Sequence, residues 1–128
     1  MSSKFIIGIK ELNSIIQKNQ DMSFLLIFTA SWCGPCQRLK SQLFKKDSEG
    51  EEVGLITNYK DKLIVLYIDV DEEENEELMN IYKVNSMPTQ ILIKINYNQS
   101  NNSLNIDKIG EISGCDLLKL KDILNKNL

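Results

Sequence analysis

The segment SFLLIFT, Ser23–Thr29, leads almost directly into two cysteines, and this junction constrains the fold more than any other part of the chain. Its side chains are apolar at odd and even positions alike, which predicts a strand buried on both faces of a sheet. The residues from Cys36 onward, with Leu39 and Leu43 at helical spacing, predict a helix. Cys33 and Cys36 are therefore expected at a turn that leads from a buried strand into a helix.

The cysteine and histidine counts limit the chemistry of this pair. The 128-residue chain has three cysteines and no histidine. It therefore cannot form a Ser-His-Asp triad, a Cys-His dyad or a Cys2His2 zinc site, and an all-cysteine zinc site would need a fourth thiol. Three uses remain open at this point: dithiol-disulfide exchange, a metal ion or iron-sulfur cluster shared between two chains, and simple packing.

Apolar periodicity predicts the other elements. Strand patterns occupy residues 4–9, residues 62–70, the segment after Pro88 and residues 104–110. Helical spacing occurs over residues 9–20, over residues 77–84 and at the C-terminus. The order β-α-β-α-β-α-β-β-α predicts an α/β fold, with a central mixed sheet of about five strands and about four helices on both faces, in one domain spanning residues 1–128.

Finer details of the helices can also be predicted. Residues 55–60 are expected to resume the second helix after an irregular stretch, and Ile81 is expected to face inward from the third. Ser113 and Asp116 suit the N-cap and third residue of the last helix. The acidic run at residues 69–77 lacks the glycine of a calcium loop, so we interpret it as the first turn of the third helix.

With these elements placed, the motifs WCGPC (Trp32–Cys36) and MPT (Met87–Thr89) resemble those of the thioredoxin family, and the resemblance covers nearly the whole chain. The resemblance implies the thioredoxin fold and a redox-active disulfide between Cys33 and Cys36. It also implies a cis peptide bond between Met87 and Pro88, packed against that disulfide.

Helix electrostatics assign different roles to the two cysteines. Cys33 would lie at a helix N-terminus, where unpaired N–H groups and the positive end of the dipole favour the thiolate, so it is expected to be the nucleophile. Cys36, one turn later and less exposed, is expected to be the resolving thiol. Gly34 permits the tight backbone path, and Pro35 fits a first turn whose N–H groups have no helical partner.

The resemblance further implies a thioredoxin-type electron carrier that acts as a protein-disulfide reductase. It would use no bound cofactor or metal, would receive electrons from a separate NADPH-dependent reductase such as thioredoxin reductase, and would be a monomer. A target peptide would lie on an apolar rim and pair with the backbone at Met87. The substrate-binding residues carried over to this rim are Trp32, Gly34, Pro35, Val70, Met87, Pro88, Ile109 and Gly110.

The chain departs from the family pattern at four positions. Ile27 and Tyr67 occupy the places where thioredoxins usually have a buried aspartate and a nearby lysine, so the usual proton acceptor for Cys36 is missing. Because a tyrosine is a poor base at neutral pH, we expect a slower or differently tuned resolving step. Thr29 replaces an aromatic residue, and Ser41 replaces a helix-kinking proline, so the second helix is expected to run straighter.

Charge and hydropathy limit which classes of partner and which cellular compartment the protein can have. The net charge of -3 argues against nucleic acid as the main partner, which would need a basic face. The N-terminus does not read as a signal peptide, and no apolar run approaches the ~18 residues of a membrane span. We therefore expect a cytoplasmic protein with no membrane partner.

Three features leave the function partly open. Segments 47–54 and 96–105 lengthen loops relative to a minimal thioredoxin and are expected to be neutral, and Cys115 is expected to be a small buried hydrophobe. A competing hypothesis is a thioredoxin-fold binding or adaptor module with a slow or vestigial redox site. The missing aspartate and the longer loops motivate it.

Overall fold

The apolar segment before the cysteines forms the centre of the sheet. In the computed structural model, which describes residues 3–128, β2 (Ser23–Thr29) is buried along its whole length. It pairs in parallel with β3 (Leu63–Asp69) and antiparallel with β4 (Thr89–Asn98). The outer strands are β1 (Ser3–Ile6), parallel to β3, and β5 (Ser103–Ser113), antiparallel to β4. The strand order is β1-β3-β2-β4-β5.

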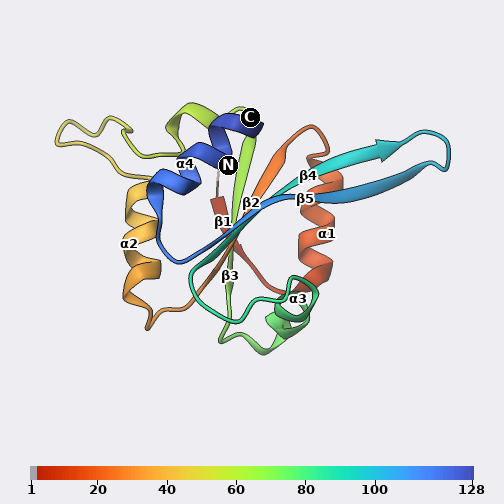
Figure 1. Ribbon diagram of the computed structural model, residues 1–128, viewed down its shortest axis with the longest axis horizontal. Helices are drawn as coiled ribbons and strands as arrows, with labels where there is room; N and C mark the ends of the chain where they lie inside the picture. The colour runs from red at the N-terminus through yellow and green to blue at the C-terminus, as the bar shows by residue number, and fades with distance from the viewer. Residues whose placement is uncertain (1–2) are drawn as a thin grey trace.

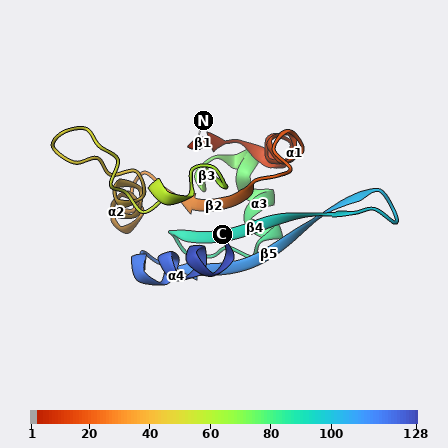
Figure 2. The same ribbon diagram turned by 90° about the horizontal axis from the view of Figure 1, so that it is seen from above.

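Helices cover both faces of this sheet. In Figures 1 and 2, α2 and α4 lie on one side of the strands, and α1 and α3 lie on the other. Their bounds are Gly8–Lys18 for α1, Gly34–Leu43 for α2, Glu76–Ile81 for α3 and Leu117–Asn127 for α4. The predicted element order, mixed sheet and helix placement are confirmed. None of the helices in residues 3–128 is long and apolar enough to cross a membrane.

Alternation along the strands divides the core into two layers. On β3, Val65 and Tyr67 face the α2–α4 side, whereas Leu66 and Ile68 face the α1–α3 side. Leu39 and Leu43 of α2 pack into the first layer, as their spacing predicted. Because α2 follows β2 directly, its first turn lies at the end of the central strand. The Cys33–Cys36 pair therefore lies at the edge of the buried core.

Three predicted details of the helices are wrong. The helix α2 begins at Gly34, two residues before the predicted start, because Cys33 itself is the N-cap. Residues 55–60 do not resume α2; they contain only a short 3-10 turn, Thr57–Tyr59. Ile81, predicted to face inward, is 49% exposed at the end of α3, where Leu78 supplies the buried contact.

The C-terminal helix begins later than predicted, because β5 is longer than its apolar pattern. Ser113 is the last residue of β5 and is not an N-cap. Asp116 caps α4 instead, and its side chain accepts a hydrogen bond of 3.0 Å from the backbone N–H of Lys119. The acidic residues after β3 do stand at the start of α3, as predicted, with Glu76 and Glu77 in its first turn.

The segment at 96–105 is mostly paired strand, although it was predicted to be a loop. β4 runs to Asn98 and β5 begins at Ser103, so only a four-residue turn joins them. The side chains of Asn98 and Asn101 accept hydrogen bonds from the backbone two residues later, which closes the turn. The result is a two-stranded arm that projects from the sheet, seen at the right of Figure 1.

Candidate active site: the Cys33–Cys36 disulfide

The two cysteines form a disulfide across the first turn of α2. Their Cα atoms are 5.3 Å apart, within the range that a disulfide bridges without backbone movement. Gly34 and Pro35 are the first two residues of the helix. Both are exposed, and they form the short backbone path between the two sulfur atoms.

The environment of the sulfur atoms supports the predicted division of roles. Cys33 is the N-cap of α2, and its Sγ accepts a hydrogen bond of 3.2 Å from the backbone N–H of Cys36. After reduction, such a donor and the positive end of the helix dipole favour a thiolate at Cys33. Cys33 is 6% exposed and Cys36 only 2%, so Cys33 is the more accessible sulfur for an external disulfide.

Three apolar side chains surround the disulfide and come from separate parts of the chain. Ala30 lies just after β2, Val70 just after β3 and Met87 just before β4, and all three pack in one cluster with the cysteines. The Met87–Pro88 bond is cis, as the resemblance implied. Val70 and Met87 are thus brought to the cysteines as predicted.

Trp32 presents most of its ring to solvent beside the disulfide. The residue is 67% exposed, and its indole Nε1 donates a hydrogen bond of 2.8 Å to Oδ2 of Asp71. Asp71 was not predicted to belong to the site. Its position two residues after the end of β3, next to Val70, was the only available signal. The contact fixes one edge of an otherwise exposed aromatic surface.

Ile109 and Gly110, predicted to belong to the substrate rim, do not reach it. Gly110 pairs with Leu92, four residues along β4 from Pro88, and a Cβ atom at Gly110 would lie 3.2 Å from the side chain of Ile123 in α4. Ile109 packs into the core below α4. The glycine therefore makes room for a helix, and the predicted rim is wrong at these two positions.

Two residues further along the chain occupy the place beside Pro88. Ser113 pairs with Thr89, and the N–H of Gly114 donates a hydrogen bond of 2.7 Å to the carbonyl oxygen of Pro88. The prediction failed because it matched a glycine by its sequence context, whereas the register of the β4–β5 pair brings the later Ser113 and Gly114 to this end of the sheet.

Comparison with known proteins identifies the family. The thioredoxin family model matches residues 5–111. The chain belongs to the thioredoxin family. It is similar to thioredoxin-1 of Drosophila yakuba, with 35% identity over 111 residues that cover 87% of this chain and 84% of the relative. It is also similar to thioredoxin-1 of Caenorhabditis elegans, with 30% identity over 82% of this chain and 72% of the relative.

Solved thioredoxin structures agree over the full fold. The germline-specific thioredoxin Deadhead of Drosophila melanogaster superposes with a TM-score of 0.72 at 29% identity, covering 98% of this chain and 99% of that one. The reduced thioredoxin pre-protein of Schistosoma mansoni gives a TM-score of 0.73 at 25% identity, with both chains fully covered. Together with the paired cysteines, these findings establish a thiol-disulfide oxidoreductase with a thioredoxin fold.

At the two positions where thioredoxins usually have a buried aspartate and a lysine, this chain has an isoleucine and a tyrosine. Ile27 on β2 and Tyr67 on β3 are direct register partners on the α2–α4 side of the sheet. Burial raises the pKa of Tyr67 to about 12, and its hydroxyl has no hydrogen-bond partner among residues 3–128. A phenol with that pKa stays protonated at neutral pH, so Tyr67 cannot accept the Cys36 proton.

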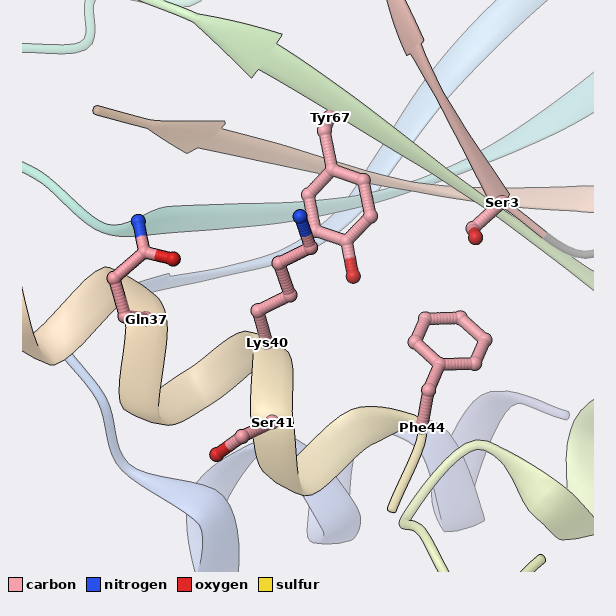
Figure 3. Close-up of a pocket in the computed structure, with 6 residues that line it drawn as sticks. All are labelled: Ser3, Gln37, Lys40, Ser41, Phe44 and Tyr67. Carbon is pink, nitrogen blue, oxygen red and sulfur yellow. The ribbon is translucent and has the colours of Figure 1, made fainter. Parts of the chain in front are cut away.

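The ring of Tyr67 also leans toward the edge of the sheet. It stacks on Phe5 of β1 with ring centroids 5.1 Å apart, and the ammonium group of Lys40 lies 5.2 Å from its centroid. Figure 3 shows Tyr67 beside Lys40 in a hollow of about 490 Å³ between the sheet and α2. The residues that line this hollow are Ser3, Gln37, Lys40, Ser41, Phe44 and Tyr67.

Gln90 and Cys115 also lie at this end of the fold. Gln90 on β4 is 1% exposed, a burial that the apolar strand pattern gave no reason to expect of a polar side chain. Cys115 is a free thiol that packs against the α2–α4 core but is only half-buried, so the predicted burial is met in part.

Proposed function

We propose that this thioredoxin is a protein-disulfide reductase. The observation that carries the proposal is the position of Cys33: the more exposed sulfur of the pair caps a helix, beside the open face of Trp32. A disulfide placed next to an exposed aromatic surface suits a large substrate, because an extended segment of a target protein can lie across Trp32, Val70 and Met87.

The reduced protein would act in two exchanges. The Cys33 thiolate attacks one sulfur of the target disulfide, which forms a mixed disulfide and releases the other target sulfur as a thiolate. Cys36 then loses its proton and attacks Cys33 Sγ, which releases the second target sulfur. The two leaving thiolates take up protons from Cys36 and from solvent. The target gains two electrons, and this protein is left with the Cys33–Cys36 disulfide.

The oxidised protein must then be reduced again by another molecule. We place this protein in the cytoplasm as a monomeric carrier without a bound cofactor, and we assign its electron supply to a separate NADPH-dependent reductase of the thioredoxin reductase type. The single dithiol centre supports the need for a separate donor. It holds two electrons at a time, so it must be reduced again between successive targets.

Turnover of insulin with dithiothreitol as the electron source tests the proposal. The intact protein should accelerate insulin reduction, and Cys33→Ser should reduce the rate to that of dithiothreitol alone, since Cys36, the thiol that remains in the site, is buried. Cys115→Ser is the matched control, because it removes a thiol outside the site, and it should keep the wild-type rate. Binding of insulin without turnover by the intact protein would contradict the proposal and indicate the adaptor function.

A further inference from the structure

Two buried polar atoms lack a hydrogen-bond partner in the described part of the chain, and they lie on the same row of the sheet. They are Oη of Tyr67 and Oε1 of Gln90. The register pairs Ile27 of β2 with Tyr67 on one side and with Gln90 on the other. A buried polar atom without a partner destabilises the fold, and such atoms are rare enough to call for an explanation.

The two atoms differ in their surroundings. The Tyr67 ring leans onto Phe5, toward the outer edge of the sheet, and lines the open hollow of Figure 3. Gln90 lies on the other side of Ile27, on β4, and is held in place, because its Nε2 donates a hydrogen bond of 3.0 Å to the carbonyl oxygen of Gly114. The N–H of Gly114 is in turn bonded to the carbonyl oxygen of Pro88.

The register places the Gln90 side chain at the cysteine end of the α2–α4 layer. Gln90 lies two residues before Leu92, whose side chain packs in that layer, so both side chains are on the same face of β4. Cys36 precedes Leu39 of the same layer by one helical turn and is almost fully buried. Gln90 is also only two residues from Pro88, next to Met87 of the disulfide cluster.

Cys36 can supply a donor to Gln90 only in the reduced protein. In the disulfide, Cys36 carries no hydrogen, and Oε1 of Gln90 remains without a partner. Reduction adds two electrons and two protons to the pair and leaves a thiol at Cys36, whose S–H is a donor. We propose that Oε1 of Gln90 accepts a hydrogen bond from the Cys36 thiol in the reduced protein, so that Gln90 is a positioning residue for the resolving step.

The bond would hold the resolving thiol in place and would not remove its proton. An amide oxygen is a hydrogen-bond acceptor and a very weak base, so the proton still passes to a leaving thiolate or to solvent when Cys36 attacks Cys33. The bond stabilises the dithiol, and its absence leaves a buried acceptor unsatisfied in the disulfide. This single difference between the two states favours the reduced state and makes the redox potential less negative.

The equilibrium with glutathione tests this inference. The reaction is protein disulfide plus two reduced glutathione molecules, giving protein dithiol plus one glutathione disulfide. Gln90→Met keeps the length of the side chain and removes the amide, so its equilibrium constant should shift about tenfold toward the protein disulfide. For a two-electron couple this shift corresponds to a potential roughly 30 mV more negative.

Tyr67→Phe is the matched control, because it removes the other unpartnered polar atom from the same row. Its equilibrium constant should stay within about twofold of wild type, since the Tyr67 ring leans away from the cysteines. A purely structural role for Gln90 would lower the stability of both redox states equally and leave the potential unchanged. An unchanged constant in Gln90→Met, or a shift toward the dithiol, overturns the inference.

A second measurement uses the wild-type glutamine and does not depend on the folding of Gln90→Met. In a Cys33→Ser, Cys115→Ser protein, Cys36 is the only thiol, and its infrared S–H stretch should lie at the lower frequency of a hydrogen-bonded thiol. A frequency typical of a free thiol contradicts the inference. The inference rests on the proposed dithiol cycle, but the failures differ: loss of insulin turnover refutes the cycle, and an unshifted potential with intact turnover refutes only the role of Gln90.

Discussion

Tyr67 shows how a single buried hydroxyl affects both chemistry and stability. Its side chain is 3% exposed, and desolvation alone raises its pKa to about 12. The phenol therefore contributes no base to the exchange of disulfides at neutral pH. Its hydroxyl is a desolvated polar atom without a hydrogen-bond partner, and this destabilises the folded state.

Replacing this hydroxyl should stabilise the protein. Tyr67→Phe keeps the stacking on Phe5 and removes the unpartnered oxygen, so we expect the free energy of unfolding at pH 7 to rise by about 1 kcal/mol. Urea denaturation of the oxidised proteins measures the change. A decrease of similar size would show that the hydroxyl is satisfied in solution and would contradict this description of the site.

The same residue makes stability depend on alkaline pH. The folded pKa of Tyr67 lies above its unfolded value of 10.0, so the folded state keeps its proton where the unfolded state loses it. Stability is therefore complete below pH 10 and falls as the pH rises toward 12, by about 2 kcal/mol in total. Burial also raises the pKa of Tyr82, so wild type must be compared with Tyr67→Phe, whose loss of stability over pH 10–12 should be smaller.

At the scale of elements, Asn75 joins three segments that the sequence does not visibly connect. It is completely buried just before α3. Its Oδ1 accepts a hydrogen bond of 2.7 Å from the N–H of Gly8, and its Nδ2 donates one of 2.9 Å to the carbonyl oxygen of Asp69. The start of α1 and the end of β3 are thereby fixed against each other on the α1–α3 side of the sheet.

Removing this amide should destabilise the fold without altering the redox site. Asn75→Ala leaves the partly buried N–H of Gly8 without its partner and removes one of the two hydrogen bonds that the Asp69 carbonyl accepts, so we expect a loss of about 1–3 kcal/mol in the free energy of unfolding. Thermal unfolding followed by circular dichroism measures it. Asn80→Ala on the exposed side of α3 is the matched control and should change stability by less than about 0.5 kcal/mol. Equal effects of the two variants would refute the role of Asn75.

Element type was predictable where the pattern was strong, and element ends were not. β2 and β3 are almost continuously apolar, and their positions follow from burial on both faces. The end of β5 could not be predicted in this way, because Ile112 is the one apolar side chain among its last three residues, and a single apolar position sets no period. The misplacement of the rim at Ile109 and Gly110 follows from that one boundary.

The residues of the site also fall into a predictable and an unpredictable group. The cysteines, Trp32 and the Met87–Pro88 pair are recognisable because their types and spacing are specific to the chemistry. Asp71 and Gln90 are not recognisable in this way, since their roles depend on hydrogen bonds to Trp32 and Gly114, and only the fold brings these partners together.

At the scale of the whole molecule, the extra length of the chain lies away from the cysteines. The β4–β5 arm begins beyond Lys94, the last residue of β4 that pairs with β2. In Figure 1 the arm projects from the end of the sheet opposite to the turns that follow β2 and β3. Leu104 and Ile106 line a hollow together with Ile16 of α1, so this side of the arm faces the first helix and not the cysteines.

Shortening the arm should therefore leave the redox activity intact. Replacing residues 96–105 with Asn-Gly would join the paired residues Ile95 and Ile106 through a two-residue hairpin turn. We expect insulin reduction to remain within about twofold of wild type, with a stability loss of roughly 1 kcal/mol from the lost Leu104 contact. A tenfold loss of insulin turnover, with unchanged reduction of a small aromatic disulfide, would instead place a protein substrate on the arm.

The central claim is that Cys33 attacks the target and Cys36 releases it, and trapping the mixed disulfide tests this claim most directly. Cys36→Ser, reduced and mixed with insulin, should accumulate a covalent adduct through Cys33, detected by intact mass and reversed by dithiothreitol. Cys33→Ser under the same conditions should form little adduct, because its remaining active-site thiol is buried. Accumulation of the adduct by Cys33→Ser and not by Cys36→Ser would contradict the account.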